Sequence, residues 1–119
     1  MKHIEDDLQM ACVRWFNLQY PNVVMFHIPN GGKRDAREGA RFKAMGVMPG
    51  VADLFVMSGH EGDYLKPGAY GLFIELKAPH GSQTESQRVF KAYCINEGYA
   101  YELCRTLDEF MKVVNDYLT

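Results

Sequence analysis

Two apolar runs of the sequence carry acidic residues at positions where a buried strand normally has none. The first run spans residues 51–57 (Val-Ala-Asp-Leu-Phe-Val-Met) and the second spans residues 70–77 (Tyr-Gly-Leu-Phe-Ile-Glu-Leu-Lys), with a polar, glycine-containing loop between them. Charged side chains rarely lie within apolar strands unless they are paired or bind a metal ion. Asp53, Glu75 and Lys77 therefore need a common explanation, which favours a fold that brings the two strands together.

Glu75 and Lys77 are two residues apart, so both side chains project from the same face of an extended strand. If the strand with Asp53 pairs beside this one, two carboxylates and one ammonium group meet in a small volume. Such a carboxylate pair, with water and substrate phosphates, is a usual way for proteins to hold Mg²⁺. A neighbouring lysine can orient water or neutralise charge on a phosphate. The alternative is that Asp53 caps a turn while Glu75 and Lys77 are exposed on an edge strand.

The sequence around these charges resembles a known nuclease family. Residues 50–53 (Gly-Val-Ala-Asp) and 74–77 (Ile-Glu-Leu-Lys) resemble the PD-(D/E)XK signature, with Gly50 and Asp53 standing where many members have Pro-Asp. Further blocks lie at 30–34 (Asn-Gly-Gly-Lys-Arg), 46–54 (Gly-Val-Met-Pro-Gly-Val-Ala-Asp-Leu) and 81–87 (Gly-Ser-Gln-Thr-Glu-Ser-Gln). They narrow the resemblance to the VRR-NUC branch, in particular its small stand-alone, phage-type proteins. A lone E-x-K is weak evidence, whereas these ordered blocks cover nearly the whole chain.

The resemblance implies a role for each candidate site residue. Asp53 and Glu75, with the main-chain carbonyl of Leu76, are expected to hold Mg²⁺ or Mn²⁺. A glutamate on the first helix of the family faces the metal site, and Glu5 is the match, with Asp6 as its rival. Acids in a first helical turn also have a sufficient structural explanation in the helix dipole. The remaining expected catalytic residues are Lys77 and Gln87.

A cluster of basic residues precedes the first acidic run. Five of the thirteen lysines and arginines fall between positions 33 and 43, although the net charge of the chain is −2. Such a segment can follow a phosphate backbone even on a mildly acidic protein, and the alternative is a solvated helix face. The expected nucleic-acid contacts are Asn30, Lys33, Arg34, Arg37 and Arg41.

Periodicity predicts an alternation of helices and strands. Helical spacing of apolar residues covers 3–20 and the last helix opens at Thr106, while a short basic helix is expected over 35–45. Residues 23–28 are expected to form a buried strand, and residues 99–104 a further strand. Ser82 and Glu85 predict a capping box for a helix that runs to Gly98. The result is an α/β sandwich with a four-stranded mixed β-sheet flanked by α-helices, for which the resemblance implies the restriction-endonuclease-like core.

Composition limits the remaining possibilities. A length of 119 residues predicts a single domain over 1–119, and 47% apolar with 24% charged residues is typical of a soluble globular protein. Without a membrane-length apolar run or a signal-peptide pattern, we expect an intracellular, cytoplasmic protein with no membrane partner. Three widely spaced cysteines predict reduced core residues, and the four histidines show no zinc-site spacing. His27 and His80 lie near predicted strand ends, from which they could approach the site, although ordinary surface or core roles are favoured for each.

The predicted function is a Mg²⁺- or Mn²⁺-dependent DNA endonuclease. No segment offers an obvious major-groove reading helix, so selectivity for DNA structure is expected rather than for sequence. Stand-alone VRR-NUC proteins resemble Holliday-junction resolvases and act as homodimers, which implies branched DNA as substrate and a homodimer here. The alternatives are a flap- or nick-directed nuclease and a non-catalytic nucleic-acid-binding module. A metabolic enzyme is disfavoured because the chain has neither a G-x-G-x-x-G motif nor a P-loop.

Overall fold

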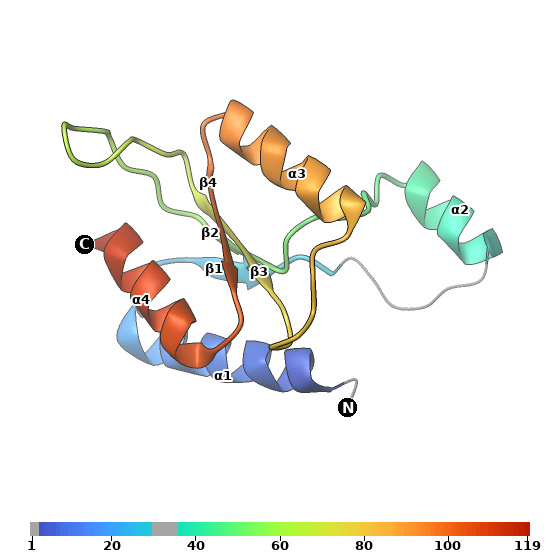
Figure 1. Cartoon of the computed structure of the whole chain (residues 1–119), viewed down its shortest axis with the longest axis horizontal. Helices are drawn as coiled ribbons and strands as arrows, with labels where there is room; N and C mark the ends of the chain where they lie inside the picture. Colours follow the sequence, from blue (N-terminus) through green and yellow to red (C-terminus); the bar gives the residue numbers. More distant parts are fainter. Residues whose placement is uncertain (1–2, 30–35) are drawn as a thin grey trace.

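The computed structural model describes residues 3–29 and 36–119, which form four helices around a four-stranded sheet (Figure 1). The helices are α1 (Ile4–Gln19), α2 (Ala36–Ala44), α3 (Glu85–Asn96) and α4 (Leu107–Leu118). The strands are β1 (Met25–His27), β2 (Leu54–Val56), β3 (Leu72–Leu76) and β4 (Ala100–Cys104), and they lie in the order β1-β2-β3-β4. The β1–β2 and β2–β3 pairs are antiparallel and the β3–β4 pair is parallel. The mixed sheet predicted from the sequence is confirmed.

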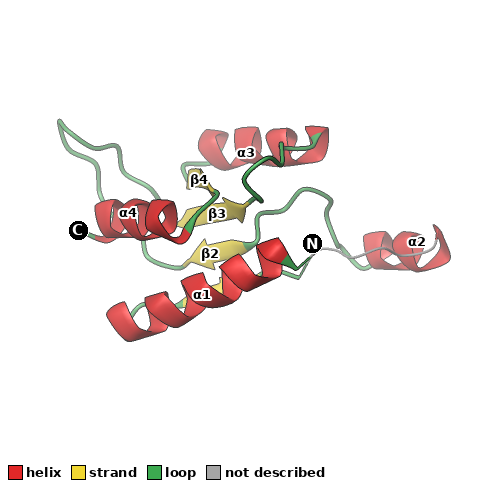
Figure 2. Cartoon of the chain, turned by 60° about the horizontal axis from the view of Figure 1, so that its bottom comes forward, coloured by secondary structure: helices red, strands yellow, loops and turns green. Residues whose placement is uncertain are grey.

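Helices cover both faces of the sheet. Helices α1 and α4 pack together on one face, and α3 covers the other (Figure 2). The side chains of β3 alternate accordingly, because successive residues of a strand point to opposite faces. Leu72, Ile74 and Leu76 join the main core beneath α1 and α4, whereas Phe73 packs with the smaller cluster beside α3. Glu75 lies at the next position of the α3 face.

Strand β1 differs from its prediction. It is three residues long and lies at one edge of the sheet, and Phe26 is 45% exposed. The prediction of a buried strand over 23–28 is therefore wrong. An apolar run can also serve at a sheet edge, where only the paired side is covered by a neighbouring strand. This edge position leaves the last residue of β1, His27, exposed to solvent.

The two later helices begin at threonines. Helix α3 has Thr84 as its N-cap, with Gln87 closing a reciprocal capping box, so the prediction of Ser82 and Glu85 placed the box two residues too early. The segment 82–87 contains two overlapping matches to the capping-box pattern, and the second one is formed. Helix α4 has the predicted Thr106 cap, although the Glu109 carboxylate accepts from the Arg105 main chain instead of completing a reciprocal box.

Helix α2 stands apart from the two layers that cover the sheet, as both views show (Figures 1 and 2). None of its residues is buried, and its basic side chains face solvent. Gly46, two residues beyond its end, has a φ of +101°, which glycine adopts at little cost. The predicted basic helix closed by Gly46 is present.

The three cysteines, Cys12, Cys94 and Cys104, are buried and unbridged, as predicted. Burial raises the pKa of the Cys12 thiol to about 12, so it behaves as an inert core group. No helix in the described part of the chain combines the length and the apolar character needed to cross a membrane.

Candidate active site

The sheet register brings Asp53 and Glu75 together. Leu54 of β2 pairs with Ile74 of β3 in an antiparallel ladder, so one step outward along each strand places Asp53 beside Glu75. Gly50 helps the preceding loop to reach this position. A Cβ atom at Gly50 would lie 2.8 Å from the Gln87 nitrogen, and the φ of Gly50 is +86°. The loop therefore passes closely against the first turn of α3 because residue 50 has no side chain.

Main-chain groups hold Asp53 on two sides. Its carboxylate oxygen Oδ2 accepts a hydrogen bond of 2.7 Å from the Leu76 N–H. Its main-chain carbonyl accepts a hydrogen bond of 2.9 Å from the Ile28 N–H of the β1 end. The Asp53 carboxylate is thus fixed in direction by β3, while its backbone is fixed by the edge strand.

Glu75 is a buried acid at the end of β3. Its exposed fraction is 3%, and Oε2 accepts a hydrogen bond of 2.9 Å from Nε2 of Gln87. The other end of the same amide accepts from the Thr84 N–H, so Gln87 caps α3 and holds Glu75 at once. The Glu75 Oε1 atom is buried and has no hydrogen-bond partner when the carboxylate is ionised. When Glu75 is ionised, Oε1 thus lacks a hydrogen-bond donor among the described residues, which is costly in a protein interior.

Burial changes the pKa values of both acids, Asp53 and Glu75. Burial, followed by the negative charge of Asp53, raises the pKa of Glu75 to about 8, although the ammonium of Lys77 opposes the rise. Burial also raises the pKa of Asp53, against the lowering effect of the Leu76 hydrogen bond. Hydrogen bonding between the two acids favours a proton on Glu75. The pair can therefore share one proton, which a bound cation would replace.

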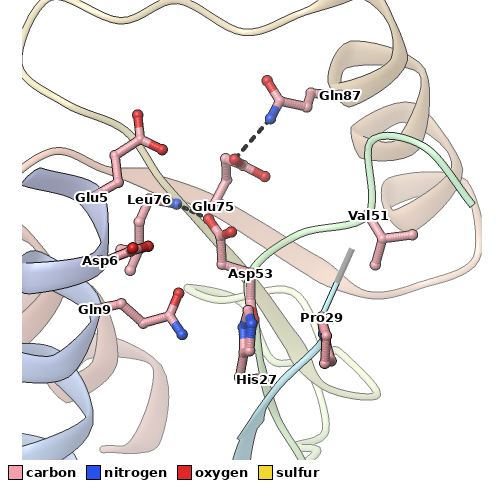
Figure 3. Close-up of a pocket in the computed structure, with 10 residues that line it drawn as sticks. All are labelled: Glu5, Asp6, Gln9, His27, Pro29, Val51, Asp53, Glu75, Leu76 and Gln87. Carbon is pink, nitrogen blue, oxygen red and sulfur yellow. Dashed lines mark hydrogen bonds between the residues drawn. The ribbon is translucent and has the colours of Figure 1, made fainter. Parts of the chain in front are cut away.

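The two acids open into a cavity of about 450 Å³ that is lined by charged and amide side chains. Figure 3 shows Glu5, Asp6 and Gln9 of α1 on one side of Asp53, with Gln87 on the other. Glu5 accepts a hydrogen bond of 3.1 Å from the Ala78 N–H, whereas Asp6 pairs with His3 at 3.7 Å. Both rivals for the first-helix role line the cavity, and only Glu5 affects the pKa values of both Asp53 and Glu75.

Lys77 is 9% exposed and follows the end of β3. Its main-chain N–H donates to the Cys104 carbonyl at 3.1 Å, which extends the β3–β4 pairing by one residue. Its charge reaches Glu75, because it lowers the pKa of that acid. The exposed edge pair considered for Glu75 and Lys77 is excluded, since both residues are buried.

Of the predicted nucleic-acid contacts, the two that the structure describes, Arg37 and Arg41, do not line the cavity. Arg37 and Arg41 project from exposed positions of α2, away from the two acids. Asn30, Lys33 and Arg34 lie outside the described residues. The two acids and these two arginines thus lie on separate elements of the fold.

Among residues 3–29 and 36–119, no group of three or more His, Cys, Asp or Glu side chains is arranged to hold a metal ion. Asp53 and Glu75 nevertheless suit a hard cation such as Mg²⁺, which usually takes only one or two carboxylates and keeps several waters. The Oε1 atom of Glu75 is the observation that favours a cation at this place, because it is buried without a partner among the described residues and a cation would supply one.

His27 lines the cavity, although the sequence favoured an ordinary surface or core role for it. Its Nδ1 atom lies 2.8 Å from the main-chain oxygen of Asp53, and its side chain lines the cavity. The signal available in the sequence was its place at a strand end, two residues before Pro29 of the Pro-Asn-Gly-Gly block. Gln9 also lines the cavity, one helical turn after Glu5, which is the same face of α1.

An α/β sandwich in which a half-buried and a buried acid lie side by side at adjoining ends of two antiparallel strands has the restriction-endonuclease-like architecture. The family model of the VRR-NUC domain matches residues 4–107, and the chain belongs to that family. A solved structure described as a VRR_NUC domain protein superposes with a TM-score of 0.76 over 97% of this chain and 88% of that chain, at 24% identity. No functionally curated protein matches the chain. Family membership implies a nuclease-type, DNA-processing function.

Proposed function

We propose that this protein is a divalent-cation-dependent DNA endonuclease, acting as one domain over 1–119, that selects DNA by structure. The single observation that carries the proposal is the buried acid pair at the cavity. Glu75 has a buried oxygen without a hydrogen-bond partner among the described residues, and its pKa is about 8. Both properties are expected of a carboxylate that binds a cation. Mg²⁺ or Mn²⁺ are the proposed ions, since carboxylate and carbonyl oxygens are the ligands.

Asp53 and Glu75 would hold the cation together with the Leu76 carbonyl, and Glu5 would complete the acidic side of the cavity. When bound, the cation supplies Lewis-acid polarisation of the phosphodiester and a lower pKa for water. The protein orients its own ligands through the Leu76 N–H on Asp53 and the Gln87 amide on Glu75. Lys77 would balance negative charge beside Glu75 and stabilise the charge that develops on the phosphate.

Substrate binding would rest on the DNA backbone. Arg37 and Arg41 on the exposed helix α2 would contact flanking phosphates, with Asn30, Lys33 and Arg34 as further proposed contacts. Phosphate contacts position a duplex without reading its sequence. We therefore propose branched DNA, such as a Holliday junction, as the substrate, with a homodimer presenting two sites.

The experiment compares cleavage of a labelled four-way junction with matched linear duplex, single strand, nicked and flap DNA, in Mg²⁺, in Mn²⁺ and in EDTA. Paired, cation-dependent cuts in the junction that are absent with Glu75→Gln are the expected result. Cation-dependent cutting of flap or nicked DNA instead would support the proposed hydrolysis but would contradict a branched junction as the substrate. Binding without cutting of any substrate would contradict the enzymatic proposal and favour a nucleic-acid-binding module.

A further inference from the structure

His27 joins the edge strand to the acid pair. It is the last residue of β1 and pairs with Leu54, the residue after Asp53. The main-chain carbonyl of Asp53 accepts from the Ile28 N–H at 2.9 Å and lies 2.8 Å from Nδ1 of His27. Two consecutive residues thus converge on one carbonyl oxygen, next to a proposed cation ligand.

This contact fixes which nitrogen of His27 carries hydrogen. A carbonyl oxygen only accepts hydrogen bonds, so Nδ1 must be the donor. In the neutral ring, Nε2 then has a free lone pair and acts as an acceptor. The ring is exposed and lines the cavity, so Nε2 is accessible to water there (Figure 3).

Most other polar groups of the cavity already have a role. Asp53 and Glu75 are the proposed cation ligands, and the Gln87 amide is shared between Thr84 and Glu75. One oxygen of Glu5 accepts from the Ala78 N–H. Lys77 is a donor only and does not line the cavity. Asp6 pairs with His3. The uncharged acceptors that remain at the cavity are the amide oxygen of Gln9 on α1 and Nε2 of His27 at the end of β1.

We propose that His27 is a further catalytic residue of this site, an inference that rests on the proposed nuclease function. Its Nδ1–H holds the Asp53 main chain, and its Nε2 accepts a hydrogen bond from the attacking water. In hydrolysis the water oxygen bonds to phosphorus and the bond from phosphorus to one deoxyribose oxygen breaks. The proton that the water loses passes to solvent, and the leaving oxygen takes a proton from solvent. A water held by Nε2 directs its lone pair to phosphorus, because its hydrogen points away toward the ring.

Three substitutions separate the two contacts. His27→Asn places an amide nitrogen where Nδ1 lies and keeps the donor to Asp53 without an acceptor at the Nε2 position. His27→Gln can place its amide oxygen near the Nε2 position but loses the Nδ1 donor. His27→Ala loses both, and His80→Asn is the matched control, because it makes the same change at an exposed histidine that does not line the cavity.

The expected result is that His27→Asn keeps the wild-type unfolding temperature, KM and Mn²⁺ binding, while kcat falls about 100-fold, the range typical of a lost proton-handling contact. His80→Asn should retain kcat to within about threefold, which is a small part of that effect. His27→Gln should recover part of the kcat that His27→Ala loses.

Wild-type kcat in His27→Asn would overturn the role of Nε2, since the remaining contact would be structural only. A wild type that cleaves none of the DNA substrates would overturn the nuclease proposal and this inference with it. The two failures are therefore distinguished by the wild-type reaction.

Discussion

The cavity and helix α2 are built in opposite ways. At the cavity, Glu75 is 3% exposed and both acids are held by named hydrogen bonds. On α2, by contrast, no residue is buried, and the basic side chains face solvent. Ligands of a small cation need positions fixed to a fraction of an ångström, so they are built into the strands of the core. Phosphate contacts tolerate movement, because charge acts over several ångströms in any direction.

The buried acids oppose folding when no cation is bound. An acid whose pKa is raised in the folded state binds its proton more tightly folded than unfolded. For Glu75 the folded pKa is about 8, against an ordinary value of 4.5. Glu75 therefore adds most to the free energy of unfolding below about pH 4.5, where it is protonated in both the folded and the unfolded state. This contribution is lost as the pH rises to about 8. The acid that would bind a cation at the cavity, Glu75, therefore lowers the stability of the folded protein when it is ionised.

The largest effect is expected from replacing either acid by its amide. Asp53→Asn and Glu75→Gln should each lower kcat/KM about 1,000-fold, since several kcal/mol of cation-assisted stabilisation is removed. In EDTA, Glu75→Gln should be more stable than the wild type at pH 8, and this difference should shrink toward pH 5. Thermal unfolding at a series of pH values, together with cleavage rates, measures both effects.

Glu102→Gln is the matched control for this prediction, because Glu102 is an exposed acid on the neighbouring strand β4. It should change neither cleavage nor the pH dependence of unfolding. An equal pH slope in Glu75→Gln and the wild type would contradict the proposed protonation of the buried pair.

A smaller effect is expected from helix α2. Arg37→Ala combined with Arg41→Ala should weaken DNA binding with little change in kcat, because the helix lies apart from the acids. The slope of log K against log salt should fall in magnitude by about 2, one for each lost phosphate contact. Fluorescence anisotropy at several salt concentrations measures this slope.

A control for this pair is Arg14→Ala combined with Lys112→Ala, which removes the same charge from α1 and α4. Both residues are exposed, and this variant should bind nearly as the wild type does. An equal loss of salt dependence in the two double variants would mean that α2 has no special place in DNA binding.

The sequence predicted the centre of the fold better than its edges. Asp53, Glu75 and Lys77 could be grouped because acids are conspicuous in apolar strands, and strand alternation placed Glu75 opposite the main core. The burial of β1 could not be predicted, since apolar runs at an edge and in the centre look alike. The sequence also could not decide between Ser82 and Thr84 as the N-cap of α3, because both residues match the capping-box pattern. His27 could only be named as a residue near a strand end, because its contact is with the main chain of a residue 26 positions away.

The cation site itself is tested most directly by isothermal titration calorimetry with Mn²⁺ on the wild type, Glu75→Gln and Glu102→Gln, at pH 8 and without DNA. The account predicts that the wild type and Glu102→Gln bind Mn²⁺ equally and that Glu75→Gln loses this binding. Equal Mn²⁺ affinity in all three proteins would contradict it, because the buried acid pair would then not be the cation site.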